Sequence, residues 1–220
     1  MEENIRPAKI RWSDYELGEE LANAITHGVG ALLSVWGMVA LILRGARMHS
    51  PIAVVSAALY GATLFLLYLV SCLYHALTAP GAKRVFRVLD HCTIFLLILG
   101  SYIPVTLVLI GSWKGWALFG VNAALAALGV TLTAVDMRRW KKLGMALYIA
   151  MGWLVMVALG TVVRSLSPAG VALLIGGGLC YTAGIAFYRR KGRKWMHALW
   201  HLCVMAGSFL HFFMIYGSFC

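Results

Sequence analysis

The chain has 220 residues, of which 61% are hydrophobic and only 12% are charged. A soluble domain carries roughly twice that share of charged residues, so the composition excludes an ordinary soluble fold. The formal net charge of +11 could suggest a nucleic-acid partner, but the basic residues stand in short runs between apolar stretches and form no separate basic domain. We therefore expect a membrane protein that binds no nucleic acid.

Seven apolar stretches follow one another along the chain, separated by short connections that carry charges or helix breakers. Each is close to the ~20 residues that a helix needs to cross ~30 Å of hydrocarbon. The stretches lack the alternation of a membrane strand, and lipid offers no hydrogen-bond partner to an open backbone. The predicted transmembrane helices are Leu21–Leu43, Ile52–His75, Leu89–Ile110, Trp116–Val135, Leu143–Val163, Ala169–Tyr188 and Trp195–Phe219.

The distribution of Lys and Arg predicts the orientation. Fifteen of them fall in the N-terminal tail and in the second, fourth and sixth connections, and four fall on the other side. Because basic connections stay in the cytoplasm, the N-terminus is expected there and the C-terminus outside. We expect an all-α protein of the cell membrane, with residues 1–20 as a cytoplasmic tail and residues 21–220 as one seven-helix domain.

Polar residues from three distant segments reach the same predicted depth, at the cytoplasmic ends of the helices. Ser71 and His75 end the second span, Asp90 begins the third, and His197 and His201 begin the seventh. The pairs Ser71/His75 and His197/His201 have i, i+4 spacing, which puts both members on one helix face. This convergence favours a site over separate structural roles, which an isolated histidine pair would more often have.

Asp90 is the single acidic residue within an apolar span, where an unpaired carboxylate is costly. It needs a cation, a metal or a proton. Three neutral imidazoles suit Zn²⁺, and three protein ligands plus water is the arrangement of catalytic zinc sites. We therefore expect His75, His197 and His201 as metal ligands. Asp90 would hold the metal-bound water and take its proton, with Ser71 as a further hydrogen-bond partner.

Two groups of polar residues remain open to interpretation. Glu20, Asn23 and His27 form one stripe at the start of the first span, and they could either support the site or cap the helix at the membrane interface. His91 lies ~100° around the helix from its neighbour Asp90, so the two side chains cannot both point at one ion. His91 is therefore expected either to pack between helices or to support the metal ligands. A structural hydrogen bond is expected for His211, ~15 Å deeper than the site.

The sequence around these residues also resembles that of a known family. The chain is similar to the haemolysin III family, the bacterial branch of the progestin and adipoQ receptors. The matching segments run in order along nearly the whole chain: Glu20 to Gly28, Ser71 to Ala76, Leu89 to Cys92, Ala150 to Trp153, His197 to His201, Gly207-Ser208 and His211-Phe212. One departure is Ser101 to Pro104, where the family usually reads Thr-Tyr-Thr-Pro.

The resemblance implies seven helices, a cytoplasmic N-terminus and Zn²⁺ on the residues that match His75, His197 and His201. Relatives in the wider superfamily are linked to ceramide hydrolysis, so a lipid amide or ester is the expected substrate class and membrane lipids are the expected partners. One alternative is a non-enzymatic sensor or homeostasis factor in which zinc braces the helices. A second is a cytolytic protein, although the spans offer no polar pore lining.

Overall fold

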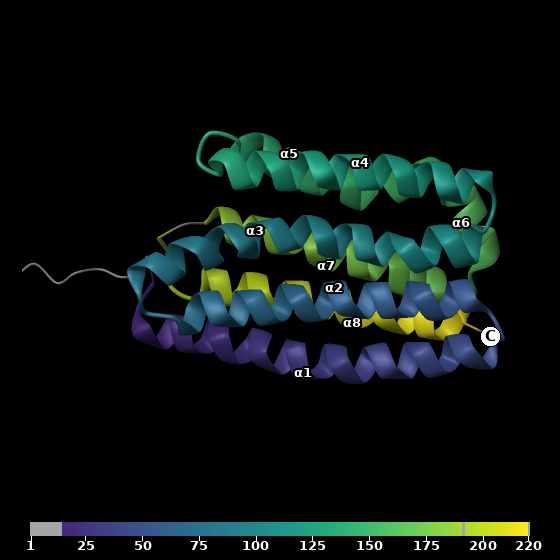
Figure 1. Ribbon diagram of the computed structural model, residues 1–220, viewed down its shortest axis with the longest axis horizontal. Helices are drawn as coiled ribbons and strands as arrows, with labels where there is room; N and C mark the ends of the chain where they lie inside the picture. Colours follow the sequence, from purple (N-terminus) through teal and green to yellow (C-terminus); the bar gives the residue numbers. More distant parts are fainter. Residues whose placement is uncertain (1–14, 191, 220) are drawn as a thin grey trace, which may run out of the picture.

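The protein is an elongated helical bundle in the computed structural model, which describes residues 15–190 and 192–219 (Figure 1). In these ranges, seven helical segments are long and apolar enough to cross a membrane. The start of α1 (Leu17–Arg47) and the end of α8 (Met196–Ser218) lie at opposite ends of the bundle, as an odd number of crossings requires. The predicted all-α class with seven spans is confirmed.

The spans are built from eight α-helices and two short irregular helices. In chain order these are α1 (Leu17–Arg47), α2 (Pro51–Ala76), α3 (Pro80–Ile103), the π-helix η1 (Pro104–Ile110), α4 (Trp113–Asp136), α5 (Lys141–Trp153), the 3₁₀-helix η2 (Leu154–Ala158), α6 (Leu159–Ser165), α7 (Pro168–Arg189) and α8 (Met196–Ser218). The third span is α3 with η1, and the fifth is α5, η2 and α6.

Two helices begin four or more residues earlier than hydropathy predicts. Helix α1 starts at Leu17 instead of Leu21, where Glu16 and Glu19 form a reciprocal capping box. Helix α3 starts at Pro80 instead of Leu89, with proline in the first turn, where its missing N–H costs nothing. The added turns are polar, so an apolar window misses them. Their residues are nevertheless part of the bundle.

The third and fifth spans each contain an irregular helix. Pro104 lacks the backbone N–H that a regular α-helix needs, and the chain passes into η1 at this residue. The Tyr102 hydroxyl lies between the two spans, where it donates to Gly152 O at 3.2 Å and accepts from Val155 N at 2.7 Å. A side chain thus satisfies backbone groups that the broken helix leaves open.

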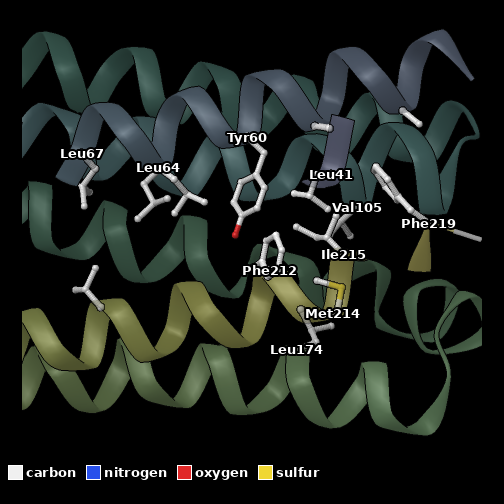
Figure 2. Packing of buried hydrophobic residues seen from close by; sticks show 14 of the residues in the cluster. Leu41, Tyr60, Leu64, Leu67, Val105, Leu174, Phe212, Met214, Ile215 and Phe219 are labelled. Atoms are coloured by element: carbon white, nitrogen blue, oxygen red, sulfur yellow. The ribbon is translucent and has the colours of Figure 1, made fainter. Parts of the chain in front are cut away.

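The apolar interior follows α1, α2, α7 and α8, with a smaller cluster between α3, α4 and α5. Figure 2 shows Tyr60, Leu41 and Ile215 pointing into this interior, and all three are fully buried. Helices α7 and α8 approach closely at glycine: a Cβ at Gly177 would lie 2.2 Å from His211 Cδ2. Many large apolar side chains face outward, as expected for a surface in contact with lipid.

Candidate metal centre

Three histidines meet at one end of the bundle. His75 lies on the last turn of α2, and His197 and His201 lie on the first two turns of α8. One nitrogen from each ring can be chosen so that all lie within 4.8 Å of one another, and this group could hold a metal ion. We call these three residues the histidine cluster. Its members are 122 or more positions apart between the two helices, so only the antiparallel packing of the bundle brings them together.

The orientation of the rings fits a metal ion. The Nε2 atoms of His197 and His201 are 3.1 Å apart, close to the ~3.3 Å between two ligands of a tetrahedral zinc with bonds of ~2.0–2.1 Å. The Nε2 atom of His75 is buried, and no residue in the described ranges hydrogen-bonds to it. A buried polar atom without a partner is costly, and a cation at this position would satisfy it. The donor set therefore fits a metal.

The other nitrogen of His75 is held by a buried carboxylate. Its Nδ1 lies 2.5 Å from Glu20 Oε2, and Glu20 Oε1 forms an ion pair with Lys83 Nζ at 2.8 Å. Lys83 also donates to the carbonyl oxygens of Tyr74 and Leu77, at 3.0 and 3.3 Å. A carboxylate on Nδ1 fixes the tautomer and turns Nε2 toward a metal. Glu20 thus orients His75, and Lys83 offsets the buried negative charge.

The start of α1 also covers the cluster. The Tyr15 ring stacks on the His197 ring with 4.8 Å between the centroids. Glu19 Oε1 accepts a hydrogen bond from the backbone N of Trp195 at 2.7 Å, which ties α1 to the residue before α8. A second link is the exposed ion pair Glu16–Lys194 at 2.9 Å, and the hydrogen bond and charge of Glu16 raise the Lys194 pKa.

Asn23 and His27, which follow Glu20 along one polar stripe of α1, lie next to the cluster on the side of the bundle interior. The His27 ring is stacked on the His201 ring, with centroids 3.6 Å apart and planes 7° from parallel. Neither ring nitrogen of His27 nor the Asn23 amide has a hydrogen-bond partner within the described part of the chain, and both side chains are buried. The polar stripe therefore faces the bundle interior beside the cluster and not the solvated surface.

A cavity extends from the cluster into the bundle. Ser71, Asp90 and His201 line it together with His27. Its volume is about 120 Å³, counted over positions that a water-sized sphere can take. One buried water needs only ~10–15 Å³ by that measure, so there is room for water and a reacting group. The Ser71 hydroxyl is buried without a partner in the described ranges.

His91 and His211 lie outside the cluster. His91 bonds to Arg87 O at 2.9 Å and to the Tyr188 hydroxyl at 3.2 Å, while its Nδ1 is 3.7 Å from Asp90 Oδ2. It is not part of the group of three histidines that could hold a metal ion. His211 lies 3.2 Å from Leu174 O, which is the structural hydrogen bond expected for it.

Seven apolar helices around a buried group of three histidines define a polytopic membrane protein with an internal metal-type site. The chain belongs to the haemolysin-III related family, which it matches over residues 15–212. That range includes the histidine cluster and all the residues described around it, and it ends within α8.

Curated relatives cover nearly the whole chain. Hemolysin-3 of Bacillus cereus is 39% identical over 197 residues, which is 90% of each chain. A hemolysin-3 homolog of Bacillus subtilis (strain 168) is 37% identical over 201 residues, 91% of this chain and 94% of the relative. A monocyte to macrophage differentiation factor of Homo sapiens is 28% identical over 215 residues, 90% of this chain and 83% of the relative.

The sequence predicts the three histidines of the cluster but not the residues that support them. From the sequence alone, Lys83 indicates only the orientation of the protein, and Glu20 has two possible roles. A signal was available: Glu20 lies four residues into a helix whose start is fixed by a capping box, and a carboxylate there faces inward with Asn23 and His27. Glu20 and Lys83 both lie in the polar first turns of their helices, α1 and α3.

Proposed function

We propose that the chain binds one Zn²⁺ ion at the histidine cluster and hydrolyses an amide or ester bond in a membrane lipid. One observation carries the proposal: Ser71, Asp90 and His201 line a single cavity whose other walls are largely apolar. Polar groups at one end of an apolar cavity suit a substrate with a polar linkage and a hydrocarbon chain.

Zinc is the metal that the donor set favours. Imidazole nitrogen is a common ligand of Zn²⁺, and three protein ligands leave a position open for reaction. Glu20 on the outer nitrogen of His75 adds the carboxylate support that is usual around zinc-bound histidine. Bound there, Zn²⁺ would supply Lewis acidity toward a carbonyl oxygen and toward water.

Asp90 and Ser71 supply the proton transfer and the hydrogen bond that the reaction needs besides the metal. A carboxylate oxygen of Asp90 accepts the proton of the attacking water, and the protonated carboxyl returns it to the leaving amine or alcohol. The Ser71 hydroxyl donates a hydrogen bond to the oxygen on which charge develops. Burial of the hydroxyl makes this bond stronger than it would be in water.

The apolar wall selects for a lipid chain. Ile94, Leu97 and Ile98 on α3 lie along the cavity beyond Asp90, and Val204 lies one turn beyond His201 on α8. Side chains of this kind gain from contact with an acyl chain and offer no partner to a polar substrate. We also assign the cluster to the cytoplasmic side of the membrane, because fifteen of the nineteen basic residues fall on that side of the predicted spans.

A second function has one observation in its favour. The cluster and its supports join α1, α2, α3 and α8, through Glu20, His75, Lys83 and His201. A metal ion at this junction would cross-link the bundle and stabilise it without turnover. In that case the protein would serve as a sensor or homeostasis factor in the membrane.

The experiment compares Asp90→Asn with the wild type for zinc content, melting temperature and hydrolysis of a panel of lipid amides and esters. If Asp90 accepts the proton, the variant keeps its zinc and loses ~10²-fold or more in rate. The matched control is Asp136→Asn, since Asp136 is the acid of the exposed α4–α5 turn and should leave the rate unchanged.

Normal hydrolysis by Asp90→Asn would contradict the role given to this carboxylate. Zinc-loaded wild type that cleaves no lipid of the panel, but loses melting temperature when the metal is removed, would favour the bracing function. A wild type that holds no zinc after purification and takes none up would contradict both.

A further inference from the structure

A second pocket opens at the same end of the bundle, between the ends of α3, α4, α5 and α7. It is lined by residues from all four helices, and its volume is about 190 Å³ over positions of a water-sized sphere. Thr133 and Gly144 are buried in its wall. Figure 1 shows that the α4–α5 turn lies at the end where α1 begins, so the pocket and the histidine cluster are at similar heights.

The lining of this pocket is basic. Arg87, Arg138 and Lys141 contribute three positive charges from three elements, and no carboxylate is among the described residues that line it. The nearest acid in the turn, Asp136, uses its Oδ1 to accept from the backbone N of Arg138 and of Arg139, at 3.0 and 2.9 Å. A concave surface with charges of one sign concentrates ions of the opposite sign.

The polar groups suit a phosphate. Two guanidinium groups can each bind phosphate oxygens through paired N–H donors, and an ammonium adds a point charge. The Thr133 hydroxyl in the wall supplies a further donor. Four helix ends placed around one pocket give these groups a defined geometry, which a basic connection that only sets orientation does not need.

The surroundings favour a lipid headgroup as the source of the phosphate. Trp140 lines the pocket, and tryptophan at the end of a span marks the height of the headgroups. The adjoining turns of α4 and α5 expose Val135 and Leu143, with 76% and 41% of their surface accessible. Acyl chains can therefore lie on these helices while the phosphate enters the pocket.

We propose that the pocket lined by Arg87, Arg138 and Lys141 is a binding site for the phosphate group of an anionic phospholipid. The site is separate from the cavity at the histidine cluster, although Tyr148 lines both. The Tyr148 hydroxyl donates to His91 O at 2.7 Å, so this ring is a fixed wall between the two. The proposal does not depend on the reaction at the cluster.

The α4–α5 turn offers a matched pair of variants. Arg138 and Lys141 line the pocket, whereas their neighbours Arg139 and Lys142 do not. The Arg139 guanidinium lies over the Trp140 ring, 5.0 Å from its centroid and within the ~6 Å of a cation–π contact. The double variants Arg138→Gln/Lys141→Gln and Arg139→Gln/Lys142→Gln remove the same charge from the same turn.

The test uses purified full-length protein in a neutral detergent, with dioctanoyl phosphatidylglycerol as the probe and dioctanoyl phosphatidylcholine as the zwitterionic comparison of zero net charge. We expect the pocket variant to weaken phosphatidylglycerol binding by about tenfold or more, at ~1.4 kcal/mol per tenfold, and the control variant to change it by less than about threefold. Equal losses in both variants would mean diffuse attraction to the turn and would overturn the site. Equal binding of the two lipids by the wild type would overturn it as well.

Competition with sodium phosphate distinguishes a lipid headgroup from free phosphate as the ligand of the pocket. At about 10 mM it should not displace the lipid, because it lacks the contacts of the acyl chains. Displacement at that concentration, lost in Arg138→Gln/Lys141→Gln, would identify a soluble phosphate ligand and overturn the lipid assignment. If the double variant does not fold, judged by its melting temperature without lipid, the single variants Lys141→Gln and Lys142→Gln replace the two doubles.

Discussion

Replacing Glu20 by glutamine separates the orientation of His75 from the stability of the bundle. Glu20 and Lys83 have only 2% and 7% of their side-chain surface exposed, and they lie 2.8 Å apart. The substitution keeps the size of the side chain and an oxygen for the His75 N–H, but it leaves the Lys83 ammonium without its counter-charge. Breaking a buried pair in this way costs ~3–5 kcal/mol.

The lower end of that range applies here, because Lys83 keeps the carbonyl oxygens of Tyr74 and Leu77. A loss of about 3 kcal/mol corresponds to a fall in melting temperature of roughly 6–12 °C for a chain of this size. Loss of the carboxylate behind His75 should also weaken metal binding ~10- to 100-fold. The assays are thermal unfolding in detergent and competition for zinc against a chelator of known affinity.

The double variant Glu20→Gln/Lys83→Met tells the two effects apart. It removes both charges, so most of the melting temperature should return, whereas the metal affinity should stay low because His75 still faces an amide. Glu16→Gln is the control, since Glu16 pairs with Lys194 at the exposed surface. Wild-type metal affinity in Glu20→Gln, or recovery of stability and affinity together in the double variant, would refute this reasoning.

Three further predictions follow from the bundle. Purified protein should hold about one zinc ion per chain, and alanine at any member of the histidine cluster should lower this, whereas His211→Ala should not; an equal loss from His211→Ala would contradict the ligand assignment. Gly177→Ala should lower the free energy of unfolding by the ~1–3 kcal/mol of an overpacked contact and lower the melting temperature with it, whereas Gly178→Ala, where an added Cβ meets nothing within 4 Å, should leave the melting temperature unchanged or raise it; equal melting temperatures would refute the close approach of α7 and α8. A reporter in the connection 138–142 should be cytoplasmic and one fused to the C-terminus should not; a cytoplasmic C-terminus would overturn the orientation.

The helical spans and the depth of their polar residues could be predicted from the sequence, because both depend on residues close together in the chain. Each span is a run of apolar residues, and in lipid such a run must be helical. The i, i+4 spacing puts Ser71 with His75 and His197 with His201 on single helix faces, and hydropathy sets their depth. The seven spans and the placement of these residues at one end of the bundle could therefore be predicted without tertiary information.

The tertiary structure decided the contacts that depend on helix rotation and on which helices are neighbours. The carboxylate of Glu20 lies 55 positions from His75, and only the packing of α1 against α2 turns one toward the other. The stacking of His27 on His201 and the entry of Lys83 into the bundle depend on the same arrangement. Hydropathy gives the depth of a residue along a helix but not its angle around the helix, so the sequence could predict the histidine cluster but not the contacts that Glu20 and Lys83 make with its surroundings.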